Sequence, residues 1–396
     1  MKVLFYLPVV TPWWLENIIS PTIAAIKRDC AVSVILPSPW SGTGVAPTAP
    51  ALQEHADVDW YYLDGPSYYA LRTAACEVPR LMDLVFDIDA DYTFCRSADT
   101  ATPGFFPGVV RFIMEYGLPP LTPLLTGHDF SLSGPQLFDR GFLPPMAPEM
   151  RSWLGDAAAR VFETNPRVRA LRAHRQSRRE YCAAAGLPAD KTIVAYPLEY
   201  ESPENFFSGF RRHRDNAAAM EAALSAMGED CCLAVTRHPL NRRYGGGRTQ
   251  AFIAAHAPRV VEVTHAADGQ PTAELIRQCD GVIVEDTKSI YIAALFGKPM
   301  LHVSRFACAA WMDAYTDAEA FFFAVGCRAA SAPAEDDVRT WFGYGLANDC
   351  INLGNPRFGW ADLRNRVDRP CDPRRWQDNL DFYARHMMGY FAETAG

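Results

Sequence analysis

The stretch 281–303, which reads GVIVEDTKSIYIAALFGKPMLHV, contains a complete strand–helix–strand unit. Gly281–Glu285 and Pro299–Val303 are apolar runs of strand length, and Lys288–Phe296 between them has the composition of a helix. Two strands joined by a crossover helix run parallel and are the building block of α/β folds. This stretch therefore predicts a doubly wound parallel sheet.

The same alternation continues on both sides of this stretch. Further strands of the second half are predicted at Thr192–Pro197, Cys232–Thr236 and Val260–Val263, with helices at Asn216–Met227, Gln250–His256 and Thr272–Cys279. In the first half the predicted strands are Val3–Val10, Ala31–Leu36, Val58–Leu63 and Tyr92–Cys95, with helices at Ile18–Lys27, Tyr69–Phe86 and Pro107–Glu115. The Pro- and Gly-rich segment Gly117–Pro148 is predicted to form loops. The pattern indicates two α/β cores.

A chain of 396 residues is long enough for two such cores. We place their junction after the arginine-rich segment Arg160–Tyr181, predicted as a polar helix, where Gly186-Leu187-Pro188 breaks the pattern. The predicted domains are residues 1–185, residues 186–370 and a terminal helix over residues 371–396. Asp372-Pro373 is a favourable start for that helix.

Composition excludes several classes of protein. The net charge of −8 is unsuited to a general nucleic-acid binder, so no nucleic-acid partner is expected. Eleven cysteines without a CxxC pair or zinc spacing indicate reduced thiols in a cytoplasm. The opening MKVLFYLPVV is interpreted as a first buried strand, because no small-residue cleavage site follows it. The absence of a long uncharged apolar run predicts no membrane-spanning segment.

Basic residues follow the strand that ends at Thr236. Arg237 and His238 can donate hydrogen bonds to phosphate oxygens, and Pro239 would hold the turn that presents them. A structural turn is the equally weighted alternative. These three residues are predicted to bind a nucleotide donor.

Hydroxyl and basic residues follow the strand Gly281–Glu285. Thr287, Lys288 and Ser289 stand where a helix begins, and free backbone N–H groups at such a point favour an anion. Ordinary capping of the helix by Asp286 or Thr287 is the alternative. The segment is predicted to seat a phosphate group.

Carboxylates follow the strand Thr192–Pro197. Glu199 and Glu201 could hold sugar hydroxyls or act as base or nucleophile, and a solvated loop is the alternative. Because all three segments follow parallel strands, they are expected at the same edge of one sheet.

Together these segments resemble the C-terminal half of bacterial capsular-polysaccharide glycosyltransferases of the GT-B fold, closest to Kdo-transferring and sialyl-type enzymes. The likeness covers about Thr192–Ser304: His238 and Pro239 match the HP pair that touches the donor phosphate, and Ser289 matches the hydroxyl at the later helix start. Phe296-Gly297-Lys298-Pro299 matches the usual exit to the next strand.

The resemblance implies two Rossmann-like domains facing a cleft, with a C-terminal helix crossing back to the first domain. It implies transfer of Kdo or a related acidic sugar from a CMP donor to a glycan or lipid-linked acceptor in surface polysaccharide synthesis. The enzyme would work in the cytoplasm, at the inner face of the membrane if the arginine-rich helix contacts anionic lipid rather than solvent.

The first half should supply a carboxylate to the acceptor, as GT-B enzymes commonly do. The candidates, in order, are Glu115, Asp99 and Asp129. The sialyltransferase signature is missing, since Leu63-Asp64-Gly65 is only a fragment of it. Two mechanisms stay open: single-step inversion with an acceptor-side base, or retention through Glu199 or Glu201 as nucleophile.

Other functions share these features. A UDP-sugar hexosyltransferase, a polyol-phosphate transferase, a sugar-nucleotide epimerase and a non-catalytic nucleotide-sugar-binding protein would each need the same phosphate seat. No cofactor is expected beyond the nucleotide sugar, and no metal, because the DxD motif Asp87-Ile88-Asp89 follows an amphipathic helix.

Overall fold

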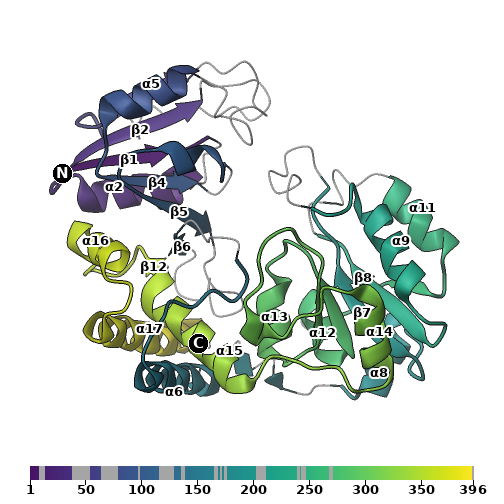
Figure 1. Cartoon of the computed structure of the whole chain (residues 1–396). Coiled ribbons are helices and arrows are strands. Elements are labelled where there is room, and N and C mark those ends of the chain that lie inside the picture. Colours follow the sequence, from purple (N-terminus) through teal and green to yellow (C-terminus); the bar gives the residue numbers. More distant parts are fainter. Residues whose placement is uncertain are drawn as a thin grey trace. The chain divides into compact units, whose positions relative to one another are not determined.

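The computed structural model describes most of the chain in two compact units. The described residues are 1–8, 14–37, 54–63, 79–96, 99–115, 129–134, 139–164, 168–169, 172–173, 176–201, 211–238, 241, 247–266 and 271–394. Unit 1 comprises Met1–Leu137, Pro144–Met146 and Tyr344–Gly396, and unit 2 comprises Phe138–Leu143 and Ala147–Gly343. Each unit contains one sheet flanked by helices (Figure 1).

Unit 1 contains a seven-stranded sheet of order β12-β6-β5-β4-β1-β2-β3. Strands β1 to β5 are parallel, whereas β6 is antiparallel to β5 and β12 is antiparallel to β6. The strands are β1 (Lys2–Tyr6), β2 (Ala31–Pro37), β3 (Asp59–Leu63), β4 (Tyr92–Arg96), β5 (Val109–Glu115), β6 (Asp129–Ser133) and β12 (Cys350–Asn352). The helical elements are η1 (Leu15–Ile19), α2 (Ser20–Ile26), α5 (Pro79–Ile88), η3 (Thr102–Phe105), η6 (Gly345–Asp349), α16 (Trp360–Asp368) and α17 (Pro373–Thr394).

Alternating residues of β1 build the two cores of unit 1. Val3 and Phe5 belong to one buried cluster, shared with α2 and α16, while Leu4 and Tyr6 belong to another, shared with α5. A strand that is apolar on both faces is typical of a parallel sheet covered on both sides. The terminal helix α17 is part of the same unit: Asn379 Nδ2 donates to Ala347 O at 2.6 Å.

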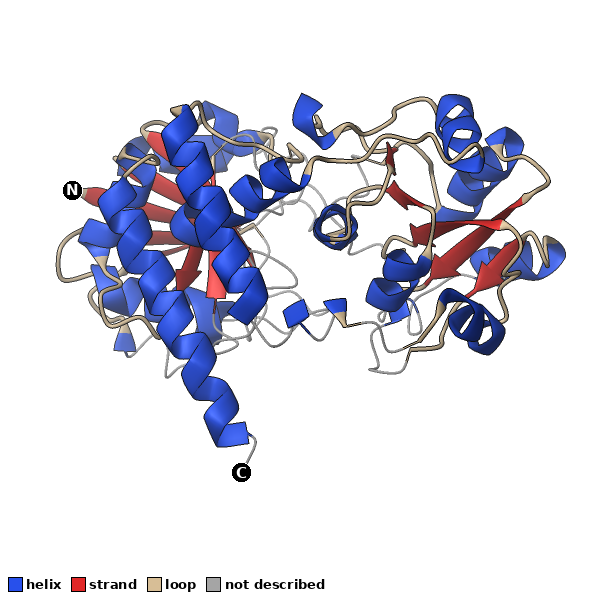
Figure 2. Ribbon diagram, turned by 90° about the horizontal axis from the view of Figure 1, so that it is seen from below, coloured by secondary structure: helices blue, strands red, loops and turns tan. Residues whose placement is uncertain are grey.

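Unit 2 contains a five-stranded, fully parallel sheet of order β11-β10-β7-β8-β9. Its strands are β7 (Thr192–Pro197), β8 (Cys231–Thr236), β9 (Val260–Glu262), β10 (Gly281–Val284) and β11 (Met300–His302). Its helical elements are α6 (Pro148–Thr164), α8 (Arg178–Ala185), α9 (Asn216–Ala226), α11 (Gly247–Ala255), α12 (Pro271–Gln278), α13 (Ser289–Leu295), η5 (Ala310–Met312), α14 (Ala318–Gly326) and α15 (Glu335–Tyr344). Helices cover both faces of the sheet (Figure 2).

The five parallel strands of each unit share one topology. In both sheets the first and fourth strands in chain order lie side by side at the centre, with the second and third on one side and the fifth on the other. This is the doubly wound, Rossmann-like strand order. Successive strands are added on one side of the first strand up to the third, and on its other side from the fourth onward. The predicted α/β class with two such units is confirmed, and ligands are expected where β7 and β10 end.

The predicted strands of the second half are confirmed to within two residues, and two predictions for the first half are wrong. The segment Pro107–Glu115, predicted as a helix, contains β5, because Val109, Val110 and Ile113 suit a strand that pairs with β4 and β6. The loop prediction for Gly117–Pro148 missed β6, whose Phe130 is buried, and the start of α6.

The range Arg160–Tyr181, predicted as one polar helix, contains helical residues but is not one continuous helix. Helix α6 ends at Thr164 and α8 begins at Arg178 after the cap Ser177, whose hydroxyl accepts from the N–H of Glu180 at 3.3 Å. A capping box there starts a separate short helix.

The two units differ in extent from the domains expected from the sequence. Residues 147–185 lie in unit 2, and residues 344–370 lie in unit 1. Helix α8 is held in unit 2 by Arg178, whose Nη2 lies 2.6 Å from Asp280 Oδ2. Helix α16 is held in unit 1 by Arg366, whose Nη1 donates to the carbonyl oxygens of Asn348 and Cys350 at 2.6 and 2.9 Å.

The turn before β5 requires glycine at position 108. Gly108 has φ +73°, and a Cβ there would lie 2.3 Å from Ala90 O. We therefore expect Gly108→Ala to lower the free energy of unfolding by roughly 2–3 kcal/mol, measured by urea denaturation. Gly104→Ala is the matched control, because nothing lies within 4 Å of its added Cβ. Equal stability of the two variants would contradict the expectation.

Candidate functional site

The adjacent ends of β7 and β10 bring Glu199 against the segment that follows β10. Glu199 Oε1 accepts hydrogen bonds from the backbone N–H of Asp286 at 3.0 Å and of Thr287 at 2.8 Å. These two N–H groups point at one carboxyl oxygen, so this place in the fold binds an acidic group, here the side chain of Glu199. It lies at the topological switch point, where doubly wound sheets bind ligands.

Glu199 is buried and held on both sides. Its N–H donates to Asn216 Oδ1 at 3.2 Å, and its carbonyl oxygen accepts from Asn216 Nδ2 at 2.9 Å and Asn241 Nδ2 at 2.7 Å. Burial raises the pKa of Glu199 to about 8, and the neighbouring carboxylates of Glu285 and Asp286 add to that increase. At neutral pH the carboxyl group is therefore mostly protonated.

A buried ion pair lies beside Glu199. Arg211 Nε and Nη2 donate to the two carboxylate oxygens of Glu285 at 3.0 and 3.1 Å, and Tyr196 OH donates to Glu285 Oε2 at 3.0 Å. Arg211 Nη2 also donates to Asn216 Oδ1 at 2.8 Å. Glu285 is fully buried, so its charge depends on this bidentate pair.

The segment after β10 carries polar atoms that have no partner within the described residues. Ser289 is buried, and its Oγ makes no hydrogen bond there; the same holds for Asp286 Oδ2. The other oxygen of Asp286 accepts from Ser304 Oγ. Unpaired buried polar atoms are costly, so a bound polar ligand is one way to satisfy them.

The basic residues after β8 differ in their surroundings. Arg237 forms a bidentate ion pair with Glu262, with Nε 2.6 Å from Oε1. His238 is exposed, and its ring lies 5.2 Å from the ring of Tyr200, centroid to centroid. Desolvation by its surroundings nevertheless lowers the pKa of His238, which favours a neutral imidazole. His238 is thus the better placed of the two to contact a ligand, and Pro239 lies outside the described residues.

Two of the predicted catalytic carboxylates, Glu201 and Asp99, accept hydrogen bonds from backbone N–H groups. Glu201 accepts from the N–H of Asn216 at 2.6 Å and from Thr249 Oγ1 at 2.9 Å, which fixes the start of α9. Asp99 is fully buried and accepts from Tyr6 OH at 3.0 Å and from the N–H groups at the start of η3. These contacts give both residues a structural role.

The other predicted residues lie at strand ends or in the helix start. Glu115 is the last residue of β5 and Asp129 the first of β6, and their side chains lie outside the described part. Thr287 Oγ1 accepts from the N–H of Ser289 at 3.3 Å, and Lys288 precedes α13 and is half-buried. Thr287, Lys288 and Ser289 thus adjoin the N–H groups that bind Glu199, while Glu115, Asp99 and Asp129 belong to unit 1.

Sequence reasoning missed Arg211, Asn216 and Asn241. No motif surrounds Arg211, and its partner Glu285 is 74 residues away. The available signal was a charged residue directly after an apolar strand, Glu285, which requires a cation when it is buried.

No group of three or more His, Cys, Asp or Glu side chains that could hold a metal ion occurs among the described residues. In the same part of the chain, no helix combines the length and hydropathy needed to cross a bilayer.

The sequence matches no known protein-family model and no curated protein. Several solved structures are similar to it. They include Thermosulfurimonas dismutans KpsC, a beta Kdo 2,7 transferase, with 11% identity, a TM-score of 0.47, and coverage of 94% of this chain and 100% of that chain. A glycosyltransferase from Rickettsia africae has 9% identity, a TM-score of 0.35 and coverage of 98% of both chains. A Methanocaldococcus jannaschii UDP-GlcNAc 2-epimerase has 10% identity, a TM-score of 0.35, and coverage of 86% of this chain and 98% of that chain.

The raised pKa of Glu199 predicts a pH-dependent stability. Folded protein retains the Glu199 proton between the ordinary value of 4.5 and about 8, while unfolded chain has lost it. The stabilisation from this proton is therefore complete below about pH 4.5 and is lost as the pH rises to about 8. Over that range the free energy of unfolding falls by up to about 1.4 kcal/mol per pH unit. Relative to Glu199→Gln, wild type should lose stability between about pH 5 and pH 8 in urea denaturation.

The neutral amide keeps the acceptor oxygen for Asp286 and Thr287, so the substitution removes the titration and little else. Glu229→Gln, at an exposed position, should leave the wild-type pH profile unchanged. Parallel profiles for Glu199→Gln and wild type would show that Glu199 does not titrate in this range.

Proposed function

We propose that this chain is a GT-B glycosyltransferase that binds a nucleotide sugar at the carboxyl ends of β7 and β10. The observation that supports it is the pair of N–H groups of Asp286 and Thr287, which converge on one acidic group at the switch point. Glu199 already uses these two donors, so a phosphate oxygen would bind beside them, where the buried hydroxyl of Ser289 has no partner within the described residues.

Glu199 would act on the leaving group. Its Oε1 accepts from both N–H groups, so the proton of the neutral acid belongs on Oε2, where it can be donated. As the bond between the sugar carbon and the phosphate oxygen breaks, the electron pair passes to that oxygen, and Glu199 supplies a hydrogen bond or the proton itself. A neutral carboxyl is a poor nucleophile, which favours this role over a covalent intermediate.

Activation of the acceptor would belong to unit 1. A carboxylate there, with Glu115 as first candidate, would remove the proton of the attacking hydroxyl in a single inverting step. The contacts of Asp99 and Glu201 described above argue against those two as the base. No metal ion enters this scheme, because Ser289, His238 and the protonated Glu199 would donate hydrogen bonds to the phosphate oxygens.

The substrates belong to the same proposal. A CMP-activated acidic sugar such as Kdo is the first choice of donor, from the sequence resemblance, and a glycan or lipid-linked glycan is the acceptor. The enzyme would act in the cytoplasm, at the inner membrane face for a lipid-linked acceptor. A UDP-sugar hexosyltransferase, a polyol-phosphate transferase or a non-catalytic binding protein would share the phosphate seat.

Calorimetric titration with CMP, CDP, UDP and GDP tests the donor site. We expect CMP to bind selectively, and His238→Ala to weaken that binding by about tenfold, the loss of one hydrogen bond to a charged group. His256→Ala is the matched control, because His256 is an exposed histidine directly after α11 whose ring packs on Phe252. Preference for UDP would replace the acidic-sugar donor by a hexose donor, and binding of none would contradict a donor site.

Turnover tests the role of Glu199. Glu199→Gln should lower kcat for CMP release from a CMP-activated acidic sugar about a hundredfold, with nucleotide affinity retained, because the amide has no proton to transfer. In wild type kcat should also fall above about pH 8, where Glu199 loses its proton. The variant should not show this fall in kcat. Unchanged kcat in the variant would remove Glu199 from the chemistry.

A further inference from the structure

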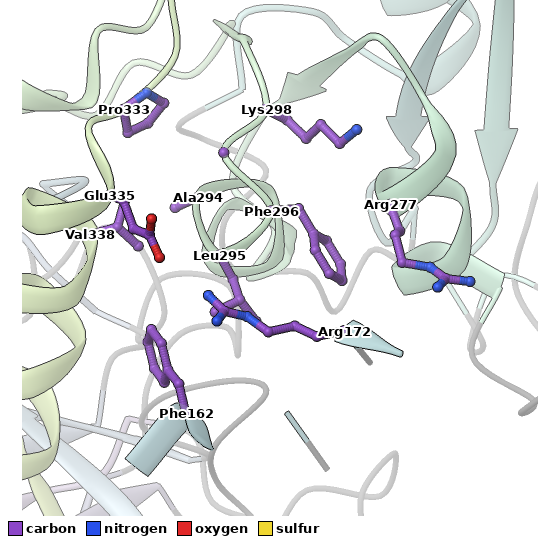
Figure 3. A pocket seen from close by; sticks show the side chains of 11 residues that line it. Phe162, Arg172, Arg277, Ala294, Leu295, Phe296, Lys298, Pro333, Glu335 and Val338 are labelled. Atoms are coloured by element: carbon purple, nitrogen blue, oxygen red, sulfur yellow. The ribbon is translucent and has the colours of Figure 1, made fainter. Parts of the chain in front are cut away.

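Unit 2 has a cavity of about 450 Å³ at the edge of its sheet opposite to Glu199. Lys298 lies just before β11, and Arg277 lies near the end of α12, before β10. The cavity therefore lies at the amino ends of these parallel strands, whereas Glu199 lies at the carboxyl end of β7. It is a separate site within the same unit (Figure 3).

Two of the three cations that line this cavity are already bound to the protein. Arg277 Nη2 is paired with Glu274 and its Nη1 donates to Ala173 O, while Lys298 Nζ donates to Cys279 O at 2.8 Å. These contacts hold helix ends in place, and the two side chains form part of the cavity wall.

Arg172 is different. Its guanidinium carbon lies 5.1 Å from the ring centroid of Phe162, and it makes no hydrogen bond or ion pair in the part of the chain that the structure describes. Stacking on an aromatic ring holds a guanidinium without using its N–H donors. Figure 3 shows this group at the cavity beside Leu295, so its donors remain available to a ligand.

A carboxylate stands across the cavity from Arg172. The side chain of Glu335 is 63% exposed; Oε1 is paired with Arg339 Nη2 at 2.6 Å. Its carboxylate is directed toward the space that Arg172 also borders (Figure 3). Phe296, Leu295 and Val338 supply apolar parts of the cavity wall.

We infer that this cavity binds an anionic sugar, one residue of the glycan that the chain elongates. Arg172 would donate two hydrogen bonds to the carboxylate or phosphate of that sugar, and Glu335 would accept hydrogen bonds from its hydroxyl groups. Phe296, which is half-buried, would cover the apolar face of the ring. The glycan as source rests on the proposed function; the binding chemistry rests on the cavity alone. The volume is within the range of small-molecule sites.

Saturation-transfer NMR and calorimetry with glucuronate, glucose 6-phosphate, glucose, inorganic phosphate and CMP test this inference. Glucuronate and glucose 6-phosphate should bind more tightly than glucose or phosphate, because each carries both the anion and the hydroxyls. CMP bound at the donor site should not compete with them. Equal binding of inorganic phosphate, or competition by CMP, would overturn the assignment.

Variants locate the binding. Arg172→Gln should weaken glucuronate binding about tenfold or more and leave CMP binding unchanged, which also shows that the protein is folded. Arg179→Gln removes a charge from an exposed position of α8 and is the matched control. Undiminished glucuronate binding by Arg172→Gln would sink the inference, whereas failure of all nucleotides to bind would count against the proposed function alone.

Discussion

The buried pair of Arg211 and Glu285 is the contact on which the site in unit 2 depends. Glu285 extends β10 into the interior, where a lone carboxylate would be strongly destabilising, and Arg211 satisfies both of its oxygens. Through Asn216, the same guanidinium is connected to the start of α9 and to the backbone of Glu199. One ion pair thus joins the ends of two strands and a helix.

Burial is the main cause of the raised pKa of Glu199, and the pair of Arg211 and Glu285 modifies that pKa. The charge of Glu285 opposes ionisation of Glu199, and Arg211 offsets only part of this effect and of burial. The result is an acid that stays protonated at neutral pH while its neighbour stays paired, so two glutamates a short distance apart have different tasks.

The sequence is informative where neighbours in the chain decide the structure. Thr192–Pro197 was predicted at its observed limits because a strand buried on both faces reads as a continuous apolar run. Val109–Glu115 was misread because a short apolar run suits a helix or a strand equally. The pairing of β12 with β6, in which Cys350 lies opposite Ser131, joins distant segments that no local pattern connects.

The same distinction separates the parts of the site. Glu199, Asp286 and Thr287 could be expected together because each follows a parallel strand, and such ends meet at one edge. The network of Arg211, Asn216 and Asn241 could not, since its contacts depend on how α9 and its flanking residues pack.

The two edges of the unit 2 sheet differ for a reason inherent in parallel topology. At the carboxyl edge, the backbone between a strand and the next helix has free N–H groups, and these bind acids such as Glu199. At the amino edge, helices end with free carbonyl groups, which require donors: Lys298 serves Cys279 O, and Arg178 serves Gln278 O at 3.1 Å. A fold of this kind therefore gathers cations at its amino edge for structural reasons. Among the three cations that line the cavity there, Arg172 makes no such contact with the described residues, and its donors are available to a ligand.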